Sequence, residues 1–272
     1  MTAVDGGTEV QEELTQTQGL MAGKRGIVFG VANERSLAWY CSKALYEQGA
    51  ELAFTYQGEA LEKRIMPLAA KVKSPFVEMC DLGKDDQIDA VFQKLEKTWD
   101  SIDFIVHAVA FAHKEDLEGH FVDTSRAGFA LALDVSAYTL TAVTKRALPL
   151  MKKGGTVTTL TYYGAEKVVP HYNVMGVAKA ALEASVMYLA SDLGEKNIRV
   201  NAISAGPVKT LAAMGIAGFR DMLKFVESKA PLKRNVEAAE VGKTALYLAS
   251  DLSSGVTGET IHVDCGYSIL GM

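Results

Sequence analysis

Short runs of β-branched and other apolar residues alternate along the chain with longer segments in which apolar residues recur at helical spacing. Buried strands are predicted over residues 25–30, 51–56, 75–80, 102–110, 155–161, 198–204 and 259–264. Helices are predicted between them, over residues 36–48, 59–71, 85–98, 125–151, 174–193 and 237–250. Strand–helix alternation of this kind builds parallel sheets with helices on both faces. The pattern therefore predicts an α/β fold with a doubly wound, seven-stranded parallel sheet.

One domain accounts for this whole pattern. The chain has 272 residues and contains neither a linker rich in Pro, Gly or Ser nor an internal repeat. Chains of this length and class commonly fold around a single core. Residues 1–19 are polar and acidic, so we expect a flexible N-terminal tail there and a single domain over residues 20–272. Residues 208–228 are mixed in character, and we expect them to be mobile.

Composition excludes several other classes of protein. The formal net charge is −5 and no basic stripe is visible, which argues against nucleic-acid binding. No apolar run reaches the ~18–20 residues that cross a bilayer, and the start of the chain does not resemble a signal peptide. Cys41, Cys80 and Cys265 stand apart, and the five histidines lack metal-ligand spacing. We therefore expect a cytoplasmic protein with reduced thiols and no metal or membrane site.

The junction between the first predicted strand and helix is suited to a phosphate group. Gly30 ends the strand and Ser36 stands where the helix begins. Free N–H groups and the positive end of the helix dipole at such a junction attract anions, while Gly30 permits close approach and Ser36 can cap the helix or bind phosphate. The usual G-x-G-x-x-G pattern is absent, however, and an ordinary β–α turn explains this segment equally well.

Residues after the second and third strands bear on the choice of cofactor. Gln57 follows the second strand, where dinucleotide-binding folds often place an acidic residue for the ribose hydroxyls. Its amide can bind the same hydroxyls, and no Arg immediately follows to favour a 2′-phosphate. NADH is therefore preferred over NADPH. Asp81 follows the third strand and can accept a hydrogen bond from adenine, although its position equally fits an N-cap or a turn.

A tyrosine and a lysine near the fifth strand form the candidate catalytic pair. Tyr172 and Lys179 are seven residues apart, so on a helix they share a face. A nearby ammonium favours the phenolate and makes the tyrosine hydroxyl a better donor, which suits polarising a carbonyl oxygen. A packed tyrosine beside a solvated lysine is the structural alternative. The position of the pair after strand five favours the catalytic interpretation, because ligands of such folds bind at the carboxyl ends of the strands.

Together these segments resemble the short-chain dehydrogenase/reductase superfamily, which has a single-domain Rossmann fold. Within it they are most similar to the NADH-dependent enoyl-acyl-carrier-protein reductases of bacterial type II fatty-acid synthesis. The resemblance runs from about Leu20 to the C-terminus. It is carried by GKRGIVFGVANERSLAW, AELAFTYQ, TYYGAEKVVPHYNVMGVAKAALEA, RVNAISAGPVKTLAA and GETIHVDCGYSI. The wide spacing from Gly30 to Ser36 is this branch's form of the phosphate loop.

The resemblance implies roles for individual residues. Tyr172 would bind the thioester carbonyl and stabilise the enolate, Lys179 would hold the nicotinamide ribose, and Tyr162 would line the substrate pocket. The other implied cofactor contacts are Gly30, Ser36, Leu37, Gln57, Asp81, Leu82, Val109, Val208 and Thr210, and Ala112 would border the acyl pocket. The implied reaction is reduction of the trans-2 double bond of an enoyl thioester by NADH. The implied partners are acyl carrier protein and three further copies of the chain in a homotetramer, whose contacts would be the long helix at 125–151 and the C-terminal strand.

Two departures from the family pattern bear on ligand binding. Ala110 replaces the glycine that relatives commonly have after strand four, so we expect weaker binding of flat diphenyl-ether inhibitors. The basic surface near the mobile segment, to which the acidic carrier would dock, retains Arg220 but has Ala217 and Asp221 beside it.

Two other functions are compatible with parts of the sequence. A ketone–alcohol short-chain dehydrogenase would usually have a serine about thirteen residues before the catalytic tyrosine, where this chain has Thr159. A non-catalytic NAD-binding sensor would keep Gly30 and Gln57 but would not need Tyr172 and Lys179. A serine hydrolase is disfavoured because the G-x-S-x-G motif is absent.

Overall fold

The computed structural model describes residues 14–210 and 218–271. Its centre is one seven-stranded sheet in which every paired strand is parallel, with the order β3-β2-β1-β4-β5-β6-β7. The strands are β1 (Arg25–Phe29), β2 (Glu51–Tyr56), β3 (Phe76–Met79), β4 (Phe104–His107), β5 (Gly155–Thr161), β6 (Ile198–Ala205) and β7 (Thr260–Val263). The predicted doubly wound sheet is confirmed, and its direction of winding reverses between β1 and β4.

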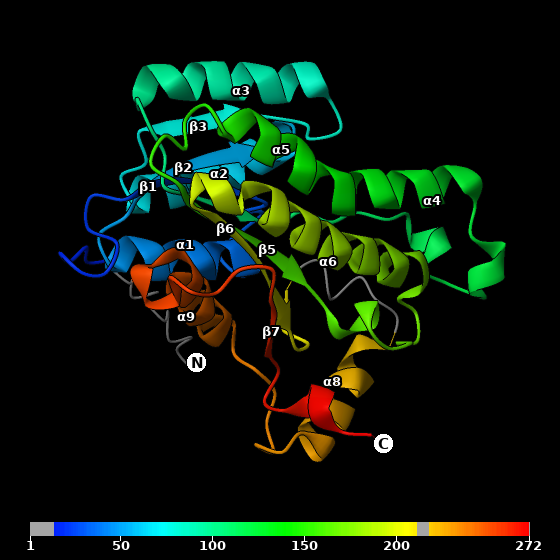
Figure 1. Ribbon diagram of the computed structural model, residues 1–272. Coiled ribbons are helices and arrows are strands. Elements are labelled where there is room, and N and C mark those ends of the chain that lie inside the picture. Colours follow the sequence, from blue (N-terminus) through cyan, green and yellow to red (C-terminus); the bar gives the residue numbers. More distant parts are fainter. Residues whose placement is uncertain (1–13, 211–217, 272) are drawn as a thin grey trace, which may run out of the picture.

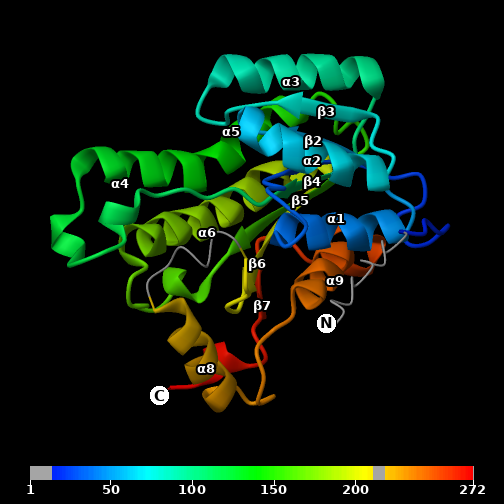
Figure 2. The same ribbon diagram turned by 180° about the vertical axis from the view of Figure 1, so that it is seen from behind.

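Helices cover both faces of the sheet and give the molecule three layers (Figure 1). One face is covered by α1 (Leu37–Glu47), α2 (Glu59–Lys71) and α9 (Ala238–Ala249). The other is covered by α3 (Asp85–Thr98), α5 (Thr139–Ala147) and α6 (Asn173–Leu193). Each face has its own apolar core. The view from behind shows α8 (Phe219–Lys229) and the C-terminus lying together beyond the edge of the sheet (Figure 2).

Central strands are buried on both faces, which explains their unbroken apolar sequence. All four residues of β4 are buried, as are the last four of β1. Gly26 of β1 pairs in register with Phe104 of β4, and a Cβ at Gly26 would overlap the Phe104 ring. The glycine therefore makes room for the aromatic side chain at the centre of the sheet.

The long helix predicted over residues 125–151 is interrupted, and that prediction is wrong in detail. It consists of α4 (Arg126–Leu133), a π-helical turn η3 (Asp134–Tyr138) and α5, which ends at Ala147. In the π-turn, Ser136 Oγ accepts a hydrogen bond from Phe111 N at 2.9 Å and lies 3.1 Å from Phe111 O. A π-turn inserts one residue without breaking the apolar face, so periodicity does not reveal it.

Other boundaries also shift from their predicted positions. Strand β4 ends at His107, and Ala108 to Ala110 already belong to the loop at the sheet edge. The segment predicted as mobile contains α8, and residues 211–217 lie outside the described residues. The described end of the predicted tail touches the domain, because Gln16 and Thr17 hydrogen-bond to the carbonyls of Ala50 and Glu47.

Two helical stretches are long and apolar enough to cross a membrane by length and composition alone. They are Arg126–Ala147 and Asn173–Lys196, and 50% and 44% of their most apolar windows are buried inside the protein. Core helices of folded α/β domains pass the same test, so this is weak evidence for a membrane span. Their remaining apolar surface faces outward.

Candidate active site

The carboxyl ends of the parallel strands bring most of the predicted site residues to one edge of the sheet. Gly30, Gln57, Asp81, Val109, Tyr162 and Val208 each follow the end of a different strand, from β1 to β6. The centre of this edge lies between β1 and β4, where the winding reverses. Ligands of doubly wound folds bind at this position.

The turn after β1 has the backbone shape of a phosphate-binding loop. Gly30 has φ +96°, and a Cβ there would overlap the carbonyl oxygen of Ala108. Only glycine allows this close approach of β1 and β4. Ser36 occupies the N-cap position of α1, but its hydroxyl donates to Asn33 O at 2.7 Å and makes no cap bond. Of the two roles considered for Ser36, its side chain does not fill that of the helix cap. The N–H groups of Leu37 and Ala38 in the first turn stay available to an anion, whereas that of Trp39 donates to Ser36 O.

The adenosine side of the edge is formed by the ends of β2 and β3. Gln57 is exposed directly after β2. Asp81 acts as a turn residue, because its carboxylate accepts from Gly83 N at 3.1 Å and its own N–H donates to Gln87 Oε1 at 2.8 Å. Leu82 is partly buried and packs on the core under α3. One oxygen of Asp81 lies 3.9 Å from Lys84 Nζ, so the carboxylate is only weakly paired.

Tyr172 is held directly before α6 by an unusual backbone. It is the N-cap of the helix, and its neighbours His171 and Asn173 have φ values of +62° and +35°. Such conformations cost energy in non-glycine residues and are found preferentially at functional sites. The Tyr172 ring packs edge-on against Tyr162, with 5.0 Å between centroids. The hydroxyl of Tyr162 donates to Met222 Sδ of α8 at 3.3 Å.

Lys179 lies two turns further along α6 and points to the same strand end. Its side chain is 6% exposed, and Nζ donates to the carbonyl of Leu160 at 2.8 Å. Leu160 precedes Tyr162 by two residues on β5, so the lysine and Tyr172 both contact the end of this strand. No hydrogen bond joins Tyr172 to Lys179 within the described residues. Both residues therefore lie near the end of β5, and the shared pocket stays a prediction.

Burial dominates the proton affinities of the pair. It raises the pKa of Tyr172, and nearby Tyr162 and Glu183 raise it further. Burial also raises the pKa of Tyr162 to about 12 and lowers that of Lys179 to about 8, although Glu183 opposes the effect on the lysine. The expectation that Lys179 favours the tyrosine phenolate is therefore wrong for this structure. At neutral pH Tyr172 is a protonated donor beside a cationic Lys179.

Sequence reasoning missed a polar network that fixes the end of β4. His107 is fully buried, with Nδ1 3.0 Å from Thr159 Oγ1 and Nε2 2.9 Å from Thr139 Oγ1. Burial first, and then Lys179, lower the pKa of His107 to about 3, so the ring is neutral. Together with the Ser136–Phe111 bonds, this network sets the path of the loop that carries Val109 and Ala110. A histidine within an apolar strand was the only sequence signal for it.

The predicted substrate-side residues surround Tyr172. Ala112 and Leu117 pack against the small apolar cluster that includes Tyr172. Val208 is partly buried against the core under α1, and Thr210 N donates to its carbonyl at 2.8 Å. A groove of about 610 Å³ runs beside Val208, lined also by Arg35 and Lys209. These two cations favour a phosphate-bearing ligand near α1.

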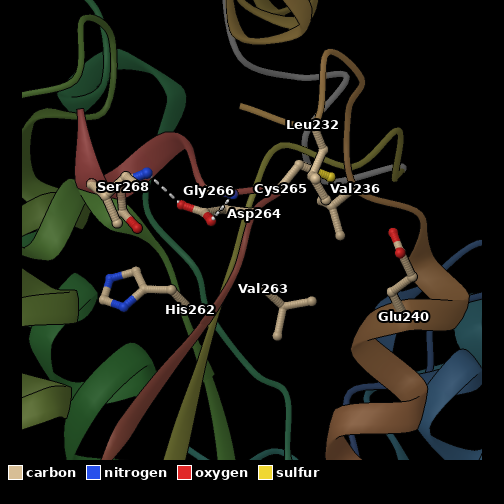
Figure 3. Close-up of a pocket in the computed structure, with 10 residues that line it drawn as sticks. Leu232, Val236, Glu240, His262, Val263, Asp264, Cys265, Gly266 and Ser268 are labelled. Carbon is tan, nitrogen blue, oxygen red and sulfur yellow. Dashed lines mark hydrogen bonds between the residues drawn. The ribbon is translucent and has the colours of Figure 1, made fainter. Parts of the chain in front are cut away.

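A second hollow lies after the carboxyl end of β7, between that strand and α9 (Figure 3). Its volume is about 380 Å³, and Asp264 on its wall accepts from Gly266 N and Ser268 N. None of the predicted site residues lines it. In the part of the chain that the structure describes, no group of three or more His, Cys, Asp or Glu side chains could hold a metal ion.

Fold and site together define a Rossmann-type oxidoreductase for a nicotinamide dinucleotide. The glycine turn, free helix N-terminus and buried Lys179 fit such a cofactor. A family model described as enoyl-(acyl carrier protein) reductase matches residues 30–268. The chain belongs to this family.

Individual relatives agree with the family assignment. The chain is 61% identical to enoyl-[acyl-carrier-protein] reductase [NADH] 1 of Rhizobium meliloti (strain 1021), over 95% of each sequence. It is similar in structure to the Bacillus cereus enoyl-acyl carrier protein reductase solved with NADP+ and indole naphthyridinone. The TM-score is 0.92 and the sequence identity 51%, and the match covers 93% of this chain and 100% of that one. The Anaplasma phagocytophilum enzyme in complex with NAD gives a TM-score of 0.91, 53% identity and coverage of 94% and 98%.

Proposed function

We propose that this protein reduces the trans-2 double bond of enoyl-acyl-carrier-protein thioesters with NADH in fatty-acid synthesis. The observation that carries the proposal is the placement of protonated Tyr172 and cationic Lys179 at one strand end, on the sheet edge where a dinucleotide binds. Family membership specifies the substrate class. NADH supplies the hydride that reduces the β-carbon of the substrate.

In this proposal Tyr172 stabilises the charge that develops during reduction. When the β-carbon gains a hydride, negative charge moves to the thioester oxygen. A phenol hydroxyl aimed at that oxygen binds the transition state more strongly than the ground state. Because burial raises the pKa of Tyr172, the hydroxyl keeps its proton and acts as a hydrogen-bond donor. The α-carbon then takes a proton from water.

The remaining residues hold the reactants in place. Lys179 binds the nicotinamide ribose, and Gly30, Ser36 and Leu37 contact the pyrophosphate. Gln57 contacts the adenosine ribose, while Asp81 and Leu82 contact adenine. Val109, Val208 and Thr210 lie along the nicotinamide side, and Ala112 with Tyr162 borders the acyl chain.

The rival dehydrogenase reaction is disfavoured by the position of Thr159. Its side chain is fully buried, and its hydroxyl donates to the His107 carbonyl at 3.0 Å. It therefore cannot act on a substrate carbonyl as the serine of ketone–alcohol dehydrogenases would. A non-catalytic sensor would have no use for a buried lysine beside a tyrosine held in a strained backbone.

We also propose a homotetramer that acts on acyl carrier protein in the cytoplasm. Large apolar side chains are exposed on the outer face of α4, η3 and α6, among them Phe129, Tyr138, Met187 and Tyr188, of which Tyr188 is 74% exposed. Contiguous exposed apolar surface is typical of protein interfaces. Analytical ultracentrifugation of the full chain tests this, and a monomer at micromolar concentration would contradict it. Arg220 is exposed on α8 and is available to the acidic carrier.

Steady-state NADH oxidation tests the proposed reaction. Crotonyl and longer enoyl thioesters are expected to be reduced, whereas ketones are not. Tyr172→Phe removes one donor to the developing oxyanion and is expected to lower kcat by roughly 10²–10³-fold. Lys179→Ala is expected to raise the KM for NADH. Equal turnover by wild type and Tyr172→Phe would refute the proposed role of the tyrosine.

A further inference from the structure

Behind Lys179 the structure encloses a second polar cluster that the reaction above does not use. Glu183 lies one helical turn beyond Lys179 on α6 and is only partly exposed. Its carboxylate accepts a 2.6 Å hydrogen bond from Thr161 Oγ1, at the end of β5. Residues four apart on a helix share a face, so Glu183 and Lys179 point toward the same strand end. A carboxylate is thus held next to the buried ammonium.

Polar side chains continue from Thr161 across the sheet. Thr161 is in register with Ser204 of β6, which is in register with His262 of β7. Side chains at paired positions of neighbouring strands lie on the same face. Ser204 is 1% exposed, and its hydroxyl has no hydrogen-bond partner among the described residues. Buried hydroxyls are normally hydrogen-bonded, so Ser204 leaves an unused donor and acceptor in the middle of the row.

The far end of the row opens to solvent. His262 Nε2 lies 2.6 Å from Glu166 Oε1, and the two side chains are 29% and 39% exposed. Figure 3 shows His262 and Val263, which both line the hollow, pointing to opposite sides of β7. Val263 packs with the core under α1 and α9, so His262 lies on the other face of the sheet, which α6 covers. Histidine is the side chain that most readily gains and loses a proton near neutral pH. The pair therefore connects bulk water with the interior row.

Glu183 interacts electrostatically with both ends of the row. Burial raises its pKa, the Thr161 hydrogen bond lowers it, and the charges of Glu166, His262 and Lys179 contribute with smaller effects. In turn Glu183 raises the pKa values of Lys179 and Tyr172. The charged and titratable groups around it are Lys179 and Tyr172 at the start of α6, Glu166 after η4 (Tyr163–Ala165) and His262 on β7. A raised pKa makes a carboxyl group a better proton carrier near neutral pH.

We propose that Glu183, with Thr161 and the Glu166–His262 pair, returns protons from solvent to the Lys179 end of the active site. The inference rests on the proposed function. Each reduction breaks one carbon–carbon π bond and forms two C–H bonds, one from the hydride of NADH, which is oxidised, and one from a proton. Water at the site gives that proton to the α-carbon. Glu183 then replaces it and takes a proton from His262 through the Ser204 region, so one proton enters per turnover.

Glu183→Gln tests the route with little change of shape. The amide oxygen still accepts from Thr161, but the group no longer carries a proton. We expect kcat to fall about tenfold, with an unchanged KM for NADH. This is less than the roughly 10²–10⁴-fold typical of general acid–base catalysis, because water still reaches the site. The solvent deuterium isotope effect on kcat is expected to rise, and added formate or acetate is expected to restore turnover. His262→Gln, at the exposed end, is expected to act in the same direction by a smaller factor.

Matched controls separate this route from a structural role and from the proposed site. Glu195→Gln changes an exposed residue just past the end of α6 and is expected to match wild type. Two outcomes for Glu183→Gln overturn the proposal. One is wild-type turnover. The other is a lower kcat with neither a larger isotope effect nor rescue by formate, which means that Glu183 only ties α6 to β5. If Tyr172→Phe is inactive while Glu183→Gln is normal, only the proton route fails. If Tyr172→Phe is fully active, the proposed site itself fails.

Discussion

Replacing Lys179 with Met is expected to change how stability depends on pH. The lysine is 6% exposed, and its pKa falls from 10.5 to about 8 on folding. Because a tenfold change in proton affinity corresponds to about 1.4 kcal/mol, holding the charge in the folded state costs about 3 kcal/mol at pH 7. Below pH 8 the folded and unfolded states both bind this proton, so the cost is fully present. Between pH 8 and 10.5 only the unfolded state binds it, so stability rises with pH.

The expected difference is large enough to measure by thermal unfolding. By pH 10 the destabilisation of the wild type by the buried charge has fallen by about 2.5 kcal/mol. The Lys179→Met variant has no such destabilisation at any pH. For a chain of this size the change corresponds to roughly 5–10 °C in Tm. The Tm of the variant minus that of the wild type is therefore expected to shrink by this amount between pH 7 and pH 10. Lost hydrogen bonding to Leu160 O shifts the difference at every pH and leaves its pH dependence intact.

An exposed lysine provides the control. Lys196→Met, just past the end of α6, removes a charge from the surface and is expected to give a Tm difference that does not vary with pH. The measurement uses the cofactor-free protein, since bound NADH adds its own charges near Lys179. A Lys179→Met difference that stays constant from pH 7 to pH 10 would refute the claim that burial sets the proton affinity of this lysine.

Two further substitutions test the cofactor edge. Gly30→Ala places a methyl group against Ala108 O at a residue with φ +96°. NADH affinity, measured by fluorescence titration, is therefore expected to fall at least tenfold, and Tm by several degrees. Wild-type affinity would contradict the proposed phosphate turn. Ala110→Gly removes an exposed methyl group from the loop after β4. It is expected to leave kcat unchanged and to lower the inhibition constant of a diphenyl ether. Equal inhibition of both proteins would show that Ala110 does not limit inhibitor binding.

Much of the fold and part of the site could be predicted from local sequence. Strands that are almost entirely apolar, such as Phe104–His107, indicate burial on both faces, which parallel sheets with helices on either side provide. Since parallel strands all end at one edge, the residues after them had to come together there. Spacing predicted one shared helix face for Tyr172 and Lys179, but Tyr172 is the N-cap that precedes α6.

Other features depend on contacts between segments far apart in the sequence. The π-turn at Asp134–Tyr138 preserves the apolar face of the helix, and it is Phe111, more than twenty residues earlier, that binds Ser136 within it. His and Asn are among the residue types enriched at positive φ, but residue type alone does not reveal that His171 and Asn173 adopt it.

The sequence by itself determined the order of strands and helices and the edge at which the strand ends meet, because both follow from periodicity within single segments. The roles of Tyr172 and Lys179 at that edge stay a prediction. Only the tertiary structure decided their proton affinities and the polar row from Thr161 to His262. Burial and cross-strand register set those properties, and both arise when β5, β6, β7 and α6 pack together.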